Sequence, residues 1–334
     1  MSIDIKTANI EPVRLTFDHL EARIGKGKSA TRYQEAVHDF QMTQNFHYRP
    51  TWEPEMELFD VRRTKIQLDD FDALTDPRQY YYGPYTIQRA KQQDNADSNF
   101  ALIEKRNLFA ALSPEWTNNI RRLIVPLRHV EWGANTNNTY LSGYGYGAPF
   151  TSAALMHAMD RLGMAQYLTR LALAVNDQDP VILDEGKALW LDDPLWQPLR
   201  RLVEDAMVQK DWFELHVLQN LLQDSQLVPL AFVHFDEAVG ATGNVAFTLG
   251  TEFMREWFNE SSRWVDATIK TASNAKPENR QLLNEWVALW WPRVQEAVAP
   301  LVLAAFGDEA STVSAALKAA LNVRLGKLGL EAVA

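Results

Sequence analysis

The sequence predicts an all-α protein, built as a bundle of long helices with an extended arm at its N-terminal end. From residue 87 to residue 334, apolar side chains recur every three or four positions in one stretch after another, which is the spacing of a helix that buries one face. The alternation of apolar and polar residues that marks a half-buried strand is almost absent. Long helices joined by short connections favour a bundle, and no segment repeats at the period of about 20–50 residues that a solenoid requires.

The arm, residues 1–86, is rich in proline and aromatic residues and has little helical periodicity. Pro50 and Pro54 each hold the preceding residue in an extended conformation, so this part of the arm cannot be helical. We expect one short helix near residues 31–44 and a short extended piece near residues 65–68. An extended arm of this length gains little by packing on itself, and it is therefore expected to lie either on its own helices or on a partner chain.

Capping residues mark where several of the expected helices begin. Ser113 precedes Pro114, the usual pairing of an N-cap with a proline in the first turn. Asp211 and Glu214 have the spacing of a capping box, and Pro229 is expected to bend the long helix that they start. The helices that we expect run from residue 113 to a Gly-Tyr loop at 143–147, and then over residues 149–175, 193–209, 211–239, 244–270, from 277 onward, and 308–325.

The composition excludes several classes of function. The chain has 43 acidic and 33 basic side chains and a formal net charge of −10, which argues against a general nucleic-acid or membrane-surface binder. Because it has no cysteine, it can form neither disulfides nor thiolate metal sites and has no cysteine nucleophile. Its apolar runs are shorter than the roughly 18 residues of a membrane span, and its first residues do not resemble a secretory signal. We expect a cytoplasmic protein.

Few residues have the spacing of a catalytic motif. Helical bundles that hold two irons take one glutamate from each of two helices and a Glu-x-x-His pair from each of the other two. Of the seven histidines, only His38 follows a glutamate, Glu35, at this spacing, and the motif has no second copy. We therefore interpret Glu35 and His38 as a surface pair. The alternative, a stand-alone carboxylate-metal oxidase, requires the second motif that the sequence lacks.

Three parts of the chain, in this order, resemble one protein family. They are the Pro-rich arm, the run at residues 69–80 (DDFDALTDPRQY), and the runs at residues 196–200 and 211–212 (WQPLR and DW). Together they resemble the β subunits of bacterial multicomponent di-iron monooxygenases, most closely those of phenol hydroxylases, over nearly the full length. In that family the catalytic α subunit and the β subunit share a ferritin-like helical fold. The resemblance therefore implies a ferritin-like domain at residues 87–334 that lacks a metal site.

The resemblance also implies where the metal ligands of an α subunit would fall in this chain. The first Glu-x-x-His motif is matched by Pro126 and His129, and the second by Glu252 and Arg255. Proline offers no ligand, and arginine stays protonated with no lone pair for a metal. These four residues are then vestigial ligand positions, and the chain has no catalytic, cofactor-binding or metal-binding residue. We expect Arg255 to pair with Glu252 or with another acid, in place of iron.

The function that the resemblance implies is a structural role in a larger enzyme, one that hydroxylates phenol or related aromatics with O2 and NADH. The implied partners are an α subunit with the di-iron centre, a small γ subunit, a regulatory protein, and a reductase that carries FAD and a [2Fe–2S] cluster. The hydroxylase itself would be a dimer of αβγ. The alternatives are the β subunit of a related toluene or alkene monooxygenase and, more distantly, the stand-alone oxidase.

Overall fold

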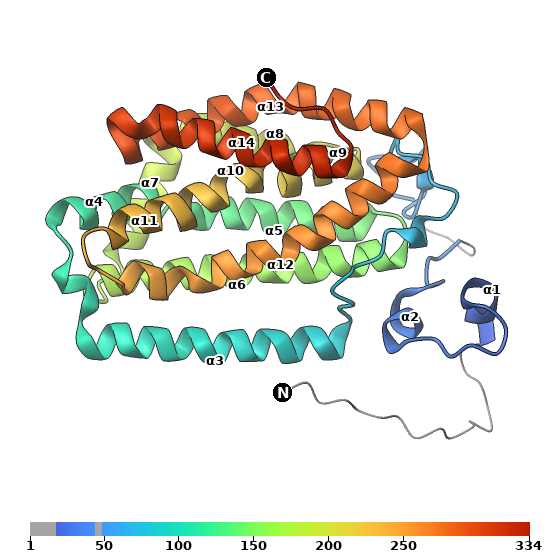
Figure 1. The fold of residues 1–334 in the computed structure, drawn as a ribbon, viewed down its shortest axis with the longest axis horizontal. Coiled ribbons are helices and arrows are strands. Elements are labelled where there is room, and N and C mark those ends of the chain that lie inside the picture. Colours follow the sequence, from blue (N-terminus) through green and yellow to red (C-terminus); the bar gives the residue numbers. More distant parts are fainter. Residues whose placement is uncertain (1–17, 44–48) are drawn as a thin grey trace.

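The computed structural model describes residues 18–43 and 49–334, and every regular element in these residues is a helix (Figure 1). The predicted all-α class is therefore confirmed. No helix in these two ranges is both long and apolar enough to cross a bilayer. The α-helices outside the segment 212–240 are α1 (Glu21–Ile24), α2 (Arg32–Val37), α3 (Tyr82–Arg106), α4 (Pro114–Leu123), α5 (Leu127–Tyr144), α6 (Ala148–Val175), α7 (Val181–Asp192), α8 (Gln197–Met207), α12 (Ala246–Ala275), α13 (Pro277–Phe306) and α14 (Ala310–Leu328).

The bundle is built around the hairpin of α5 and α6, which pack closely along their lengths. The interrupted helix at residues 212–240 packs on α5, and both this helix and α6 contact α12. Helix α3 lies along α12 at one side of the bundle, whereas α8, α13 and α14 cover the opposite side (Figure 1). One large apolar core joins these helices, and it includes Ile66, Phe71 and Leu74 of the arm.

The interrupted helix, which was expected at residues 211–239, is not a regular α-helix throughout. Two π-helical segments, Val217–Gln223 and Leu230–His234, alternate with the α-helical turns α9 (Trp212–His216), α10 (Asp224–Pro229) and α11 (Phe235–Gly240). Pro229 comes directly before the second π segment and has no N–H to donate within the helix. Such wide turns are typical of places where side chains are redirected, and here every residue from 217 to 223 is buried.

Two predicted N-caps are confirmed. The Ser113 hydroxyl accepts the N–H of Trp116 at the start of α4, at 3.3 Å. The Asp211 carboxylate accepts the N–H groups of Phe213 and Glu214 at 3.0 and 3.2 Å, at the start of α9. The capping box is not completed, because the Glu214 carboxylate accepts the Trp290 indole N–H instead. Helices α12, α13 and α14 also begin within two residues of the expected positions.

Four expectations about the helices were wrong. The short helix of the arm ends already at Val37, and Asp39 then takes a positive φ of 58° that stops it. The helix that begins at residue 114 breaks before Pro126 and restarts as α5. The expected Gly-Tyr loop is shorter, because α5 continues to Tyr144. Helix α7, Val181–Asp192, was not expected at all.

The described part of the arm lies on the chain's own helices, so this alternative holds for these residues. The piece at residues 65–68 is not a strand, because its backbone is bound by side chains. The N–H of Lys65 donates to the Asp211 carboxylate at 2.7 Å. The N–H of Gln67 donates to the Asn279 amide oxygen at 3.0 Å, and the Asn279 amide donates back to the Gln67 carbonyl at 2.9 Å. Side chains at the starts of two helices thus replace the neighbouring strand that a β-bridge would need.

The turn between α5 and α6 depends on Gly147. Its φ is +93°, a conformation that residues with a side chain rarely adopt. A Cβ atom at this position would lie 2.6 Å from the carbonyl oxygen of Phe71, a residue of the arm. The same glycine therefore allows the turn and the close approach of the arm to it.

Replacing Gly147 with alanine is expected to lower the free energy of unfolding by at least about 2 kcal/mol, because the new methyl group meets both backbone strain and the Phe71 carbonyl. The matched control is Gly143→Ala, since Gly143 lies in α5 and a Cβ there has no atom within 4 Å. This control is expected to be neutral or to gain up to about 0.5–1 kcal/mol. Urea unfolding of both variants is the measurement, and equal stabilities would contradict the role of Gly147.

Candidate functional site

The vestigial ligand positions have separate partners in the structure. Pro126 directly precedes α5, and the His129 ring stacks on Trp190 with 6.0 Å between the ring centroids. Burial lowers the pKa of His129 to about 4. The Glu252 carboxylate accepts a hydrogen bond from the Asn99 amide at 2.8 Å.

Arg255 pairs with Asp236 rather than with Glu252. The Arg255 side chain is 29% exposed, so this ion pair lies near the surface. Among the described residues, no hydrogen bond or ion pair joins Pro126 and His129 to Glu252 and Arg255. The assignment of these four positions therefore continues to rest on the resemblance.

The Glu35 and His38 pair does not form part of a metal cluster. The expectation of a surface pair was wrong for His38, which is buried where α2 ends, with its Nδ1 atom 3.8 Å from the Asp72 carboxylate. Burial lowers the pKa of His38, with a further contribution from the Arg23 guanidinium. Within residues 18–43 and 49–334, no group of three or more His, Cys, Asp or Glu side chains is placed to hold a metal ion.

The polar centre of the bundle is instead an ion triad of Glu131, Arg161 and Asp224, which we call the central triad. Arg161, on α6, has a side chain that is only 2% exposed. Its Nη1 donates to both carboxylate oxygens of Glu131, on α5, at 3.1 and 3.3 Å. Its Nη2 donates to Asp224, on α10. The guanidinium carbon lies 4.4 Å from the ring centroid of Trp257, on α12, so four helices meet at one cation.

Burial dominates the electrostatics of the central triad. It raises the pKa of both Glu131 and Asp224, and the Arg161 guanidinium offsets only part of this. For Arg161, burial alone would lower the pKa, but the two acids outweigh it and raise the pKa. Asp224 also accepts a hydrogen bond from the Gln219 amide at 3.2 Å. Removing Arg161 would leave two buried carboxylates without a cation, which costs far more than unpaired charge at the surface does.

Asp160, the residue before Arg161, is the centre of a second polar cluster. Its carboxylate accepts both Nε and Nη2 of Arg89, on α3, at 2.6 Å each. It also accepts the Tyr85 hydroxyl at 2.8 Å and the Trp257 indole N–H at 3.0 Å. Trp257 therefore contacts both clusters, with its N–H on Asp160 and its ring on the guanidinium of Arg161.

The second cluster extends to the arm, and we call its members Asp76, Arg78, Arg89, Asp160 and Glu260 the arm clasp. Arg78 donates to Asp76 at 2.9 Å and to Glu260, on α12, at 3.3 Å. Arg89 donates to the same Glu260 at 3.0 Å. The Arg78 side chain is almost fully buried, so the arm is held to α3, α6 and α12 by ion pairs that water reaches poorly.

Two buried histidines beside the central triad are neutral side chains of the core. His216 has both ring nitrogens in hydrogen bonds, Nε2 with the Thr268 hydroxyl at 2.9 Å and Nδ1 with the Asn220 amide at 3.0 Å. Burial lowers the pKa of His216 to about 3. The His157 ring packs 4.8 Å from Trp257, and burial also lowers its pKa well below the usual value.

The residues of the bundle centre do not fit a di-iron site. Such a site needs carboxylates from two helices and Glu-x-x-His pairs from two more. Glu131 and Asp224 supply carboxylates from two helices, but Arg161 and Trp257 fill the space between them. A guanidinium has no lone pair for a metal and repels one by its charge. The arrangement therefore cross-links helices, and Arg161 leaves no open ligand position between the two carboxylates.

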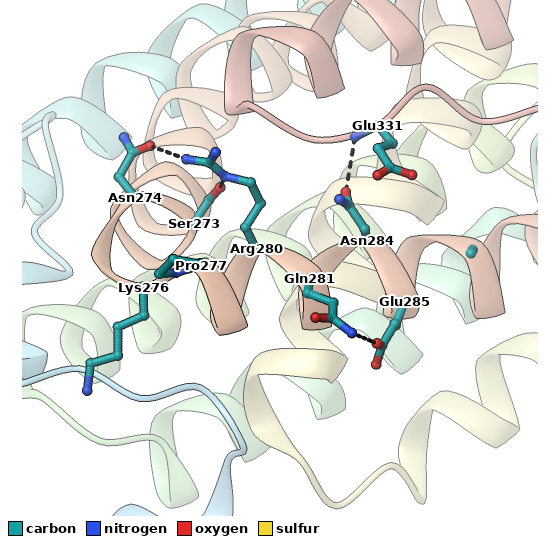
Figure 2. Close-up of a pocket in the computed structure, with 10 residues that line it drawn as sticks. Ser273, Asn274, Lys276, Pro277, Arg280, Gln281, Asn284, Glu285 and Glu331 are labelled. Atoms are coloured by element: carbon teal, nitrogen blue, oxygen red, sulfur yellow. Dashed lines mark hydrogen bonds between the residues drawn. The ribbon is translucent and has the colours of Figure 1, made fainter.

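A surface hollow of about 540 Å³ lies at the turn between α12 and α13 (Figure 2). Its polar groups mostly bond one another. Arg280 donates to the Ser273 hydroxyl at 3.3 Å, and the N–H of Glu331 donates to the Asn284 amide at 3.0 Å (Figure 2). The hollow is open and its lining is mixed in charge, so nothing in it selects a ligand.

Sequence reasoning missed the central triad. Arg161 is separated from Glu131 by 30 residues and from Asp224 by 63, and none of the three belongs to a known spacing motif. One signal was available: Arg161 and Asp160 are adjacent charges inside a long helix whose other inner residues are apolar, such as Ala154 and Met164. Two charges in such a helix must have partners on other helices, because unpaired buried charges are costly.

The fold and the site together define a ferritin-like helical bundle whose centre is occupied by side chains. The sequence pattern of the family described as methane/phenol/alkene hydroxylase matches residues 52–276. The chain is 44% identical over 333 residues to the oxygenase component DmpL of phenol 2-monooxygenase from Pseudomonas sp. (strain CF600), which covers 99% of each chain. The chain belongs to this hydroxylase family.

Two further relatives support the same placement. The crystal structure of xenon-pressurised phenol hydroxylase from Pseudomonas sp. OX1 contains a chain that matches with a TM-score of 0.90 at 44% identity, over 98% of this chain and 99% of that chain. The hydroxylase component subunit beta of the toluene-4-monooxygenase system from Ectopseudomonas mendocina is 24% identical over 237 residues, covering 70% of this chain and 71% of that protein. The predicted resemblance to the phenol hydroxylase family is thereby confirmed.

Replacing Asp160 with asparagine is expected to lower the free energy of unfolding by roughly 3–5 kcal/mol, because Arg89 then loses its buried carboxylate. Thermal unfolding is the measurement. The control is Asp97→Asn, which removes a carboxylate from an exposed pair with Arg170 and should leave the melting temperature unchanged. Equal effects of the two substitutions would show that the arm clasp adds nothing beyond a surface ion pair.

His216 is expected to make stability depend on pH. Its pKa is about 3 in the folded chain against about 6.5 in an unfolded chain, so below pH 6.5 the unfolded state binds a proton that the folded state excludes. Stability is complete above pH 6.5 and is lost as the pH falls towards the folded pKa. Between pH 7 and pH 5 the part due to His216 is about 2 kcal/mol. Denaturant unfolding of wild type and of His216→Gln at both pH values measures this contribution. An equal loss of unfolding free energy in the two proteins between pH 7 and pH 5 would contradict the expectation.

Proposed function

We propose that this chain is the non-catalytic β subunit of the hydroxylase component of a multicomponent di-iron monooxygenase, which hydroxylates phenol or related aromatics with O2 and NADH. The observation that carries the proposal is the central triad. At the centre of this bundle, Arg161 binds Glu131 and Asp224, and Trp257 covers the guanidinium, so no open ligand position lies between the two carboxylates. A chain with this centre has no means of activating oxygen by itself.

The names of the relatives support the proposal that this chain is one component of a monooxygenase complex. One relative that matches along nearly its full length is named as an oxygenase component of phenol 2-monooxygenase, and a more distant one as a subunit beta. We infer partners of the same system: an α subunit with the di-iron centre, a small γ subunit, a regulatory protein, and a reductase with FAD and a [2Fe–2S] cluster. A dimer of αβγ in the cytoplasm is the assembly that we propose.

Exposed apolar side chains on the α5–α6 hairpin support a role as a subunit. Trp132 is 57% exposed on α5, and Leu155, Met159 and Leu162 are each nearly half exposed on α6. The Asn135 amide of α5 donates to the Ala158 carbonyl of α6 at 2.8 Å, which sets the middles of the two helices side by side. Apolar surface gathered in this way is typical of a face that a partner covers.

A second candidate function is the β subunit of a related toluene or alkene monooxygenase. The 24% identity to the toluene-4-monooxygenase subunit beta supports this branch, but the 44% identity to a phenol 2-monooxygenase component supports the phenol branch more strongly. The stand-alone oxidase has no support, because no further metal ligand joins Glu35 and His38 in the part of the chain that the structure describes.

The test is co-expression of the chain with the α and γ subunits of the same system, followed by purification through a tag on this chain. We expect the three chains to co-purify with phenol hydroxylation, and separated chains to carry iron only in α. Purified alone and incubated with ferrous iron, this chain should retain well under one equivalent, because the central triad leaves no open ligand position. Two tightly held irons per chain would contradict the proposal.

A surface variant, in which glutamate replaces Met159 and Leu162, tests whether the exposed apolar face binds the α subunit. Both side chains are about half exposed, so the substitutions should leave the helical content measured by circular dichroism unchanged. We expect them to reduce the recovery of α with this chain. Recovery equal to that of wild type would place the partner on another face.

A further inference from the structure

We propose that Arg161 keeps this bundle free of metal, because its guanidinium occupies the place between Glu131 and Asp224 that a hard divalent cation would otherwise take. The inference deepens the proposed function. It rests on that function only where it concerns the complex with a catalytic subunit. The physical claim concerns the side chains of this chain alone.

The two carboxylates come from different helices and face one cation. Each terminal nitrogen of Arg161 donates to one of them: Nη1 donates to Glu131 and Nη2 donates to Asp224. All three side chains are buried. Two buried carboxylates held this close repel each other unless a cation lies between them, so this position in the bundle has to be filled by positive charge.

The two acids of the central triad and the amides linked to Asp224 offer oxygen atoms to a cation. Asp224 is linked through the Gln219 amide to Asn137, at 3.2 and 2.8 Å. The Asn137 side-chain oxygen is buried and has no hydrogen-bond partner in the described structure, and the same holds for the Gln223 side-chain oxygen. Carboxylate and amide oxygens are the ligands that Mg²⁺, Ca²⁺ and Mn²⁺ prefer. Because the two side chains that face the guanidinium directly are carboxylates, the ligand class is a hard divalent cation.

Arg161 differs from a metal ion in two ways that matter. It cannot dissociate, because it is attached to α6, and it stays protonated at any pH at which the chain is folded. A free cation can enter only by displacing the guanidinium into an apolar core, and Trp257 packs on the face of that group. In the complex, metal supplied for the catalytic chain would then not be taken up by this bundle.

The experiment measures Mn²⁺ binding by the full-length chain in which Arg161 is replaced by alanine. Removing the guanidinium opens the place between Glu131 and Asp224 and leaves both carboxylates without a cation. Equilibrium dialysis and the electron paramagnetic resonance of Mn²⁺ are expected to give about one bound ion per chain. Saturating Mn²⁺ should also raise the melting temperature of Arg161→Ala, which without metal should be lower than that of wild type by on the order of 10 °C.

Three control proteins should bind no Mn²⁺. Wild type and Arg161→Lys keep a tethered cation at the centre. Arg255→Ala removes an arginine that has a single carboxylate partner, Asp236, near the surface. Adding Glu131→Gln and Asp224→Asn to Arg161→Ala removes the two carboxylates, so this triple variant should lose the uptake and the stabilisation by Mn²⁺.

Three results would overturn the inference. The first is an Arg161→Ala chain that folds but takes up no more Mn²⁺ than Arg255→Ala. The second is uptake that persists in the triple variant. The third is an Arg161→Ala chain that stays unfolded with Mn²⁺ present during expression, because a metal that fits the position would compensate the two acids. Folding of this variant only with Mn²⁺ present would support the inference. Co-purification of the wild-type chain with its partners is unaffected by any of these results, so a failure here is distinct from a failure of the proposed function.

Discussion

The structure depends on one buried cation, the guanidinium of Arg161, at the point where α5, α6, α10 and α12 meet. A charge so deeply buried is tolerated only with opposite charges and hydrogen bonds around it. Glu131 and Asp224 provide them from two helices, and the Trp257 ring from a third. Because each partner comes from a different helix, the guanidinium fixes the relative positions of four helices at once. We interpret the guanidinium as a group that selects one packing of the helices, since an alternative packing would leave these charges unpaired.

Neighbouring residues of α6 transmit this constraint to the arm. Asp160 and Arg161 point to different sides, because successive residues of an α-helix are about 100° apart around its axis. Asp160 therefore meets Arg89 of α3, while Arg161 meets the other side of the bundle. Trp257 contacts both residues, and Arg89 shares Glu260 with the arm. The polar groups of the centre and of the arm thus form one network, which explains why an arm without its own core can lie in a defined place.

A structural feature of this chain could be predicted from the sequence where it depends only on residues that are close together along the chain. Helix positions follow from apolar spacing and from caps such as Ser113 and Asp211, which involve only neighbouring residues. The π segments depend on what packs against residues 212–240, and no local pattern of the sequence shows it. The central triad combines residues 30 and 63 positions apart, so no motif search could find it. Arg255 does pair with an acid, but with Asp236 near the surface, and the arginine buried at the bundle centre is Arg161.

A metal centre and an arginine can hold the same helices together, but they differ in charge. Two irons bring enough positive charge to neutralise several carboxylates, whereas one guanidinium faces both Glu131 and Asp224. Burial raises the pKa of both carboxyl groups, because two acids share a single cation in a site that water does not reach. A helical bundle with two buried acids at its centre can therefore hold together without a metal, because one tethered guanidinium bonds both carboxylates.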